Sequence, residues 1–335
     1  MPTTPVPNPK LFLAPMEGVT DWAMRDLLTS VGGIDQCVTE FLRITDQLMP
    51  ASVFEKNCPE LKTNSRTRSG VPVFIQLLGG QAEPLAANAR RAVEMGALGI
   101  DLNFGCPAPT VNRHDGGASL LKSSERLFNI VKTVRAAVPK GVPVTAKIRL
   151  GFDDPSACLE NALAIEEAGA TWLTVHCRTK TDGYKPPAYW EWIPRIKEKT
   201  KIPLVTNGEI WKLDDYVKCH ATAETSGYMI GRGALRDPHL FKKIKFLSEV
   251  PNSVLNTAHS TPLRELVPRF FESSVVYMNE GFAVARTKGW LKQLSLSEPE
   301  FGAIFDEVKV LTKPLEFKRV LFSKLEAPLE ANCEN

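Results

Sequence analysis

The sequence predicts an α/β fold, a parallel (β/α)8 TIM barrel followed by a small C-terminal all-α helical domain. Eight short apolar or β-branched segments alternate with amphipathic helical segments over roughly the first 245 residues, which is typical of a closed parallel barrel. Nearly every one of these segments ends in a polar or turn-forming residue. After about residue 248 the strand pattern stops and only helical patterns remain.

Each expected strand is a short run of apolar residues. In a barrel, the carboxyl ends of such strands form a single rim where ligands bind. They are residues 11–14, 34–39, 72–77, 98–103, 143–149, 171–176, 202–206 and 226–230. Apolar residues at helical spacing predict helices between them, for example over 82–95 and 123–138. Gly96 and Gly169 are placed to close two of these helices.

The change of pattern near residue 248 predicts two domains. Residues 1–248 would form the catalytic barrel, and residues 249–335 would form the helical domain, joined by a polar, Pro-broken linker at 249–262. Within the second domain, apolar spacing predicts helices over 263–280, 283–296 and 300–311. We expect the tail from residue 321 to be a frayed helix end.

The composition excludes several classes of protein. No stretch of about 18 apolar residues and no signal-peptide pattern occurs, so we expect a soluble protein with no membrane partner. We also expect a cytoplasmic protein that is a monomer. The seven cysteines are scattered without a C-x-x-C pair, which indicates reduced thiols and no metal site. Of these, Cys37, Cys177 and Cys219 are expected to be buried core residues. A net charge of +3 permits nucleic-acid binding without arguing for it.

Two glycine-containing loops follow the seventh and eighth expected strands. They read NGEI at 207–210 and GRGAL at 231–235, and the corresponding loops of TIM barrels commonly bind phosphate. Glycine lets backbone N–H groups approach an anion, and Arg232 adds a guanidinium. Either loop alone could be a tight turn, but two of them in these positions favour a phosphate site.

Polar residues within and after the strands suggest what else would bind there. An inward Lys147 in the fifth strand needs an anionic partner, and a flavin ring fits because its reduction adds negative charge near N1 and O2. The amides of Gln76 and Asn103 could meet the edges of a ring, and the segment 14–16 could cover its face. His176 ends the sixth strand on the same rim. Each residue singly could be a satisfied core group, whereas together they favour a ligand.

Cys106 follows the fourth strand by three residues, on a loop that Pro107 stiffens and Gly116 and Gly117 allow to bend. An ordinary thiol has a pKa near 8.5, so at neutral pH it is protonated and suits a general acid. The alternative is a small buried filler. No G-x-G-x-x-G motif follows any strand, so a dinucleotide reductant would have to visit the open barrel mouth.

Taken together, these segments resemble the tRNA-dihydrouridine synthases, and most closely the C-type bacterial enzymes that modify position 16. The resemblance rests on APMEGVTD, DLNFGCP followed by GGASLL, AKIRLG, VHCRT, NGEI and GRGAL, with TEFLRITDQLMP, NCPELKTNSRTRSG and ARTKGWL typical of the C-type. It implies FMN held by Pro15, Met16, Glu17, Gln76, Lys147, His176, Asn207, Gly208, Glu209, Gly231 and Arg232. It implies Cys106 as proton donor and Asn103 beside the uracil. It implies tRNA contacts by Arg43, Tyr184, Arg286 and Lys288, with Lys292 and Lys309 as neighbours.

The resemblance also implies a reaction. NADPH would reduce FMN, hydride would pass to C6 of a D-loop uracil, and Cys106 would protonate C5 after the base leaves its stack. The helical domain would hold the tRNA through phosphate contacts. Two alternatives remain open at this point: an FMN barrel acting on a free pyrimidine, like a dihydroorotate dehydrogenase, and an RNA-binding barrel with no enzymatic activity.

Overall fold

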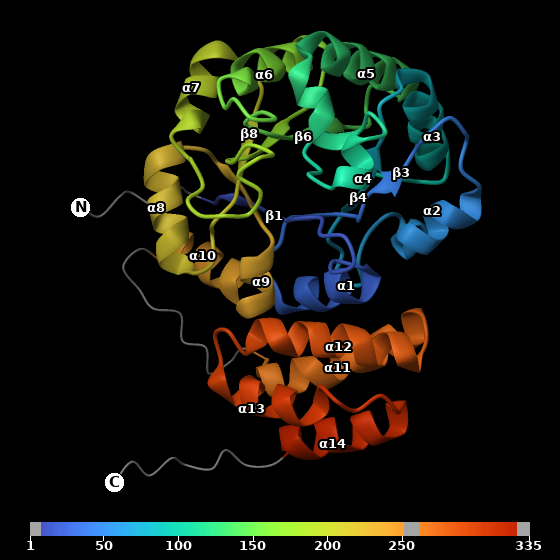
Figure 1. Ribbon diagram of the computed structural model, residues 1–335, viewed down its shortest axis with the longest axis vertical. Coiled ribbons are helices and arrows are strands. Elements are labelled where there is room, and N and C mark those ends of the chain that lie inside the picture. Colours follow the sequence, from blue (N-terminus) through green and yellow to red (C-terminus); the bar gives the residue numbers. More distant parts are fainter. Residues whose placement is uncertain (1–7, 251–260, 327–335) are drawn as a thin grey trace. The chain divides into compact units, whose positions relative to one another are not determined.

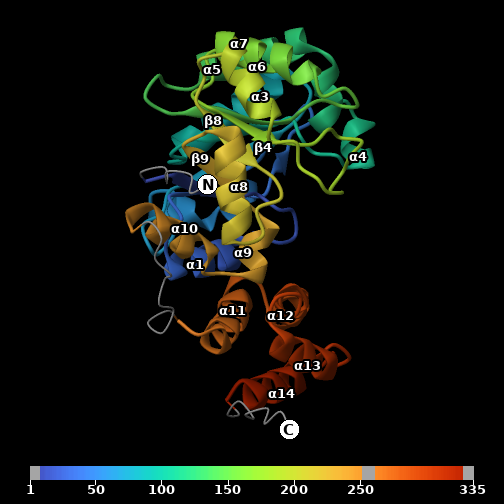
Figure 2. The same cartoon turned by 90° about the vertical axis from the view of Figure 1, so that its left-hand side faces the viewer.

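The computed structural model describes residues 8–250 and 261–326, and most of the linker expected at 249–262 lies outside them. The described residues form two compact units. One contains residues 8–234 and 239–250, and the other contains residues 235–238 and 261–326. Figures 1 and 2 show a barrel surrounded by helices in the first unit and a group of helices in the second. No helix among the described residues is long and apolar enough to cross a lipid bilayer.

The first unit is a closed parallel barrel in which each strand pairs in parallel with its neighbours. Its strands are β1 (Lys10–Leu13), β2 (Gln36–Val38), β4 (Val73–Leu78), β5 (Ile100–Asn103), β6 (Val144–Arg149), β7 (Leu173–His176), β8 (Leu204–Asn207) and β9 (Gly227–Ile230). Pairing of β1 with β9 and of β2 with β4 closes the ring. The eight predicted strands and the TIM-barrel fold are therefore confirmed. A ninth, two-residue strand, β3 (Leu42–Arg43), extends the pairing of β4 and was not predicted.

Helices cover the outside of this barrel (Figure 1). They are α1 (Trp22–Val31), α2 (Ala51–Asn57), η1 (Pro59–Thr63), α3 (Ala82–Glu94), α4 (Pro109–Asn112), η2 (Gly117–Lys122), α5 (Ser124–Ala137), α6 (Ala157–Glu167), α7 (Trp192–Lys199), α8 (Leu213–Ala223), α9 (Arg232–Arg236) and α10 (Leu240–Glu249). Local chemistry sets their starts: Asp21 accepts a hydrogen bond from the Met24 backbone at α1, and Ser123 accepts one from Arg126 at α5.

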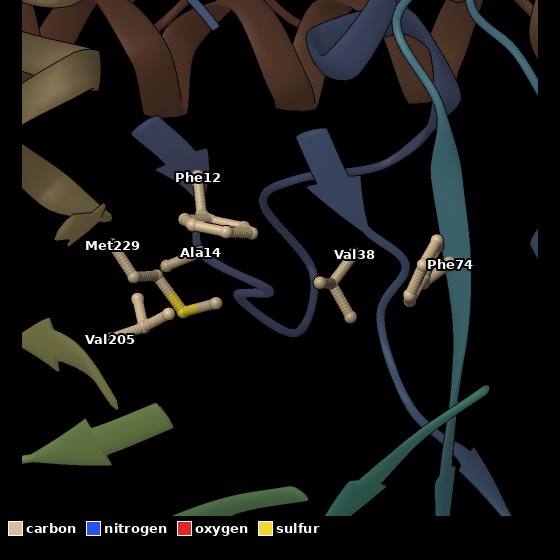
Figure 3. Close-up of a cluster of buried hydrophobic side chains, with 6 residues drawn as sticks. All are labelled: Phe12, Ala14, Val38, Phe74, Val205 and Met229. Atoms are coloured by element: carbon tan, nitrogen blue, oxygen red, sulfur yellow. The ribbon is translucent and has the colours of Figure 1, made fainter. Parts of the chain in front are cut away.

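The barrel interior has two layers because alternate residues of each strand point inward. An apolar layer contains Phe12, Ala14, Val38, Phe74, Val205 and Met229 (Figure 3). Leu98 and Trp172 pack against it. Two residues further along several of these strands, the inward positions become polar. The apolar layer thus forms the floor on which a polar layer stands at the carboxyl end of the barrel.

The second unit consists of α11 (Leu263–Tyr277), α12 (Glu280–Leu294), α13 (Pro299–Val308) and α14 (Pro314–Glu326). The first three match the predicted helices to within four residues at each end. The expectation of a frayed end is wrong for residues 321–326, because Phe317, Leu321 and Leu325 of α14 are buried, and the rest of that tail lies outside the described residues. Their spacing of four residues places them on one face of that helix, and burial of this face stabilises its last turns.

Candidate active site at the carboxyl end of the barrel

A hydrogen-bonded row of side chains begins the polar layer. Gln76 Nε2 donates to Asp101 Oδ2 at 2.7 Å, and Asn103 Nδ2 donates to Gln76 Oε1 at 2.8 Å. The Thr145 hydroxyl donates to the other oxygen of Asp101 at 2.5 Å. Burial raises the pKa of the Asp101 carboxyl, and its hydrogen bonds oppose that shift. Gln76 and Asn103 thus hold each other in fixed orientations at the base of the mouth.

Lys147 stands beside this row and projects from β6. Its Nζ donates to Asn207 Oδ1 at 2.9 Å, and Asn207 Nδ2 donates to the Met229 carbonyl at 2.8 Å. Burial, followed by the charge of Arg149, lowers the pKa of Lys147 to about 8. No described carboxylate forms an ion pair with this ammonium, so the anionic partner expected from the sequence is not supplied within hydrogen-bond range by the described chain. An ammonium in such a setting favours an anionic ligand.

Four cationic side chains surround His176 at this end of the barrel: Lys147, Arg149, Arg178 and Arg232. Arg149 Nη1 donates to the carbonyls of Thr179 and Gly183, and its Nε donates to the Gly105 carbonyl. Burial, and then the charges of Arg149, Lys147, Arg178 and Arg232, lower the pKa of His176 well below its ordinary value. His176 is therefore a neutral imidazole among four cations.

The two predicted phosphate loops lie at this mouth. A Cβ on Gly208 would lie 3.0 Å from His176 Cδ2, and one on Gly231 would lie 3.1 Å from Met16 Sδ. Gly208 has a φ of +119° and the next residue, Glu209, has +61°, so the chain turns sharply there. Trp190 Nε1 donates to the Gly208 carbonyl at 2.9 Å and fixes this turn from outside.

Cys106 lies on the loop after β5 and is partly exposed. Its carbonyl accepts hydrogen bonds from the Ala118 backbone at 3.0 Å and from Asn112 Nδ2 at 3.1 Å. Burial raises the pKa of its thiol, while Arg149 and Arg43 act in the opposite direction and Glu17 acts in the same direction. The charges that act on this thiol come from the end of β6, the end of β3 and the loop after β1, so Cys106 lies at the same mouth. Its raised pKa keeps the thiol protonated at neutral pH.

The loop after β1 brings two carboxyl groups to the rim. The backbone N–H of Val19 donates to Glu40 Oε1 at 3.1 Å, while the Met16 backbone N–H donates to the Thr20 hydroxyl at 2.7 Å. Burial and the charges of Glu17 and Asp21 raise the pKa of Glu40 to about 7. Pro15, Met16 and Glu17 are therefore held over the rim by a compact turn. Among the described residues, no cluster of His, Cys, Asp or Glu side chains could hold a metal ion.

Two residues predicted to touch RNA lie around this mouth. The Tyr184 ring is 56% exposed, with the guanidinium carbons of Arg149 and Arg232 at 5.2 and 5.1 Å from its centre. Arg43 lines a cavity of about 480 Å³ together with His114, between the ends of β3 and β4 and the loop at 111–116. Tyr184 thus lies beside two cations of the mouth, and the charge of Arg43 acts on the Cys106 thiol, whose pKa it lowers.

The other predicted RNA contacts lie on the helical unit, and they differ in accessibility. Lys292 is exposed in the last turn of α12, and Lys309 is exposed but forms an ion pair with Asp306 at 2.6 Å. Lys288 Nζ donates to the Lys309 carbonyl at 2.9 Å and to the Leu311 carbonyl, so it caps the end of α13. The guanidinium carbon of Arg286 lies 5.8 Å from the centre of the Phe270 ring.

Three further residues of the mouth, Asp101, Arg149 and Arg178, were not predicted from the sequence, although their spacing from predicted site residues indicates them. Asp101, Arg149 and Arg178 each lie two residues from a predicted site residue, namely Asn103, Lys147 and His176. The side-chain period of a strand is two, so for Asp101 and Arg149 on β5 and β6 these pairs share a face. Arg178 continues the same spacing two residues after the end of β7.

Comparisons with known proteins show the family of this chain. The family model described as Dihydrouridine synthase (Dus) matches residues 12–294. A Pseudomonas putida protein named tRNA-dihydrouridine(16) synthase is 47% identical over 90% of this chain and 92% of its own. Proteins of the same name from Shewanella oneidensis and Neisseria meningitidis serogroup A are 46% and 43% identical, covering 93% and 95% of this chain and 97% and 96% of theirs.

Solved structures share the fold at low sequence identity. Histamine dehydrogenase from a Rhizobium species superposes with a TM-score of 0.56 at 14% identity, covering 80% of this chain and 50% of that one. The old yellow enzyme homologue from Zymomonas mobilis gives a TM-score of 0.51 at 14% identity, over 75% of this chain and 92% of that one. These likenesses concern the barrel architecture alone.

Proposed function

The chain belongs to the dihydrouridine synthase family, and from that premise we propose that it reduces a uridine of tRNA to 5,6-dihydrouridine with FMN as cofactor and NADPH as reductant. We propose position 16 of the D-loop as its target, because the relatives cited above carry that position in their names. We also propose that the protein is a monomer in the cytoplasm. The observation that carries it is the convergence of a protonated thiol and four cationic side chains on one end of the barrel.

The residues of the mouth fit a flavin mononucleotide. Lys147 offers a positive charge without a carboxylate ion-pair partner among the described residues, which suits the anionic pyrimidine edge of a reduced ring. Arg232 and the turns at Gly208 and Gly231 suit its phosphate, and a Cβ at either glycine would crowd His176 or Met16. Pro15, Met16, Glu17, Gln76, Asn207 and Glu209 would complete the binding site. When bound, the cofactor supplies a hydride that NADPH has delivered.

The chain's own residues would handle the substrate. The 5,6 double bond of uracil is conjugated with the C4 carbonyl, so hydride addition at C6 leaves negative charge that a proton at C5 must neutralise. Cys106 would donate that proton from sulfur, and the raised pKa of its thiol keeps the proton available at neutral pH. Asn103, oriented by Gln76, would lie beside the uracil.

Binding of a folded tRNA requires the target base to leave its stack and enter the barrel mouth. Arg43 and Tyr184 at the rim, with Arg286, Lys288, Lys292 and Lys309 on the helical unit, would contact the RNA around it. Contacts from Lys and Arg to phosphates would set the register of the tRNA without reading its sequence.

The test compares Cys106→Ala with Cys158→Ala, a buried cysteine of α6 that serves as the matched control. We expect both variants to bind FMN and oxidise NADPH, and only Cys106→Ala to lose dihydrouridine formation on tRNA. A rate of dihydrouridine formation equal to wild type in Cys106→Ala would overturn the acid assignment. Mapping of dihydrouridine along tRNA from a strain lacking the gene tests the position.

The alternative that the sequence left open, an FMN barrel for a free pyrimidine, is less favoured because the family match extends into the helical unit, to residue 294. Supplying the reduced enzyme with either unmodified tRNA or free orotate decides between them. Turnover of orotate and not of tRNA would support the alternative. A purified protein that is colourless and binds tRNA would support the other alternative, an RNA-binding barrel with no enzymatic activity.

A further inference from the structure

Arg178 is buried completely, and its guanidinium contacts two backbone carbonyls, one carboxylate and one imidazole. Nε donates to the carbonyls of Lys185 at 2.7 Å and Pro187 at 3.2 Å, and Nη2 forms an ion pair with Glu209. Its remaining nitrogen, Nη1, lies 3.2 Å from Nε2 of His176. The side chain itself is 0% exposed. A side chain held at this many points cannot reorient, so its contact with His176 is a fixed feature of the mouth.

The chemistry of this contact leaves one protonation state for the imidazole. A guanidinium has only donors and stays charged in proteins, so His176 Nε2 has to accept the hydrogen bond. In a neutral imidazole with Nε2 as acceptor, the proton is on Nδ1. No described residue accepts a hydrogen bond from Nδ1, and the Cδ2–Nε2 edge of the ring faces Gly208 and Arg178. The Nδ1 edge is therefore the one left for a ligand.

We propose that Arg178 is a positioning residue that locks His176 in its Nδ1–H tautomer, so that His176 presents a permanent hydrogen-bond donor to the group bound in the mouth. His176 then takes no part in proton transfer, and the ligand atom it meets is an acceptor, such as a carbonyl or phosphate oxygen. The tautomer follows from the contacts of the chain alone. Only the identification of the bound group with FMN rests on the proposed function.

Charged groups from every neighbouring element support a neutral His176. Arg149 and Lys147 come from β6, Arg178 from the loop after β7, and Arg232 from the first position of α9. One carboxylate, that of Glu209 after β8, is already paired with Arg178. Protonation of the ring would add a positive charge to this set and would break the hydrogen bond to Nε2.

The first experiment uses the full chain labelled with ¹⁵N at its five histidines. Long-range ¹H–¹⁵N correlation spectra report which ring nitrogen carries the proton, and the His176 signals are identified by their loss in His176→Gln. We expect an Nδ1–H pattern that does not change between about pH 5.5 and pH 8, the range where ordinary histidines titrate. An Nε2–H pattern or a titrating ring would overturn the proposal.

The second experiment removes the lock. In Arg178→Met we expect His176 to show both tautomers, because the donor that makes Nε2 the acceptor is lost, while burial and the charges of Arg149 and Lys147 keep the ring neutral. Arg25→Met is the matched control: Arg25 is equally buried and paired with Glu60 at 2.7 Å, but it has no contact with His176. Unchanged His176 signals in Arg178→Met would overturn the proposal, and if that variant does not fold, Arg178→Lys and the wild-type spectrum still decide it.

The role toward the ligand has its own readout. Addition of FMN to flavin-free protein should shift the His176 Nδ1–H signal while leaving its tautomer unchanged. If His176 is in the Nδ1–H tautomer but its signal does not shift when FMN is added, the contact with FMN is refuted and the role of Arg178 in fixing the tautomer stands. A wrong tautomer would refute the lock whatever the enzyme reduces.

Discussion

Replacing Gly117 with alanine is expected to displace the Cys106 loop. Gly117 begins η2 with a φ of +61°, and a Cβ there would lie 2.8 Å from the Cys106 carbonyl oxygen, 3.0 Å from the Cys106 Cβ and 3.0 Å from Val111 Cγ1. Real Cβ atoms do not approach backbone oxygen this closely, so either the Cys106 segment or η2 has to shift. The substitution therefore tests whether this glycine holds the thiol in place.

The magnitude has two parts. A left-handed conformation costs an L-residue about 1–2 kcal/mol, and overpacking against buried atoms adds about 1–3 kcal/mol. Gly70→Ala is the matched control, because Gly70 also has a positive φ, +83°, but nothing lies within 4 Å of its Cβ position. Gly117→Ala should thus lower the free energy of unfolding by about 2–5 kcal/mol, and Gly70→Ala by the first part alone.

Urea unfolding measures the stabilities, and dihydrouridine formation on unmodified tRNA measures the catalytic consequence. A misplacement of about 1 Å at a reacting group can cost about a hundredfold in rate, so we expect a clear loss in Gly117→Ala and none in Gly70→Ala. If the two variants unfold alike and react alike, the loop does not depend on close contact at Gly117, and the reasoning fails.

Four further predictions concern charged side chains. The pKa of Lys147 is lowered to about 8, so the ammonium loses its charge as pH rises through that value, and FMN binding should weaken over the same range. Lys147→Met should bind FMN weakly at every pH. The fluorescence of released FMN measures both effects. Glu40, whose pKa is raised to about 7, stabilises the fold fully below about pH 4.5 and loses this contribution as pH rises through 7, so urea unfolding of Glu40→Gln should lack that decline. Arg25→Met should lower the free energy of unfolding by about 3–5 kcal/mol, since it leaves a buried carboxylate unpaired. Lys292→Ala should weaken tRNA binding and reduce the salt slope by about one, and an unchanged slope would place the RNA elsewhere.

The barrel could be predicted because its signal is local. Each strand is a short apolar segment followed by a polar or turn residue, and eight repeats of that unit in one chain favour closure. The unpredicted elements carry little local signal: β3 has two residues, and α14, which begins at Pro314, follows α13 after only five residues. The last turns of α14 depend on tertiary burial of Leu321 and Leu325, which helical propensity alone does not reveal.

The sequence by itself determined which residue types stand at the carboxyl ends of the strands, including Lys147, His176 and Asn207. The reason is that each strand is recognised from its own short run of apolar residues, so the residues that end it follow directly. Only the tertiary structure decided what these side chains bond to. The partner of Lys147 is 60 residues away, and the donor to His176 is held by a carboxylate on the next strand's loop. The physical reason is that hydrogen bonds across a barrel depend on the register of strands that closure brings together, and register is a property of the whole ring.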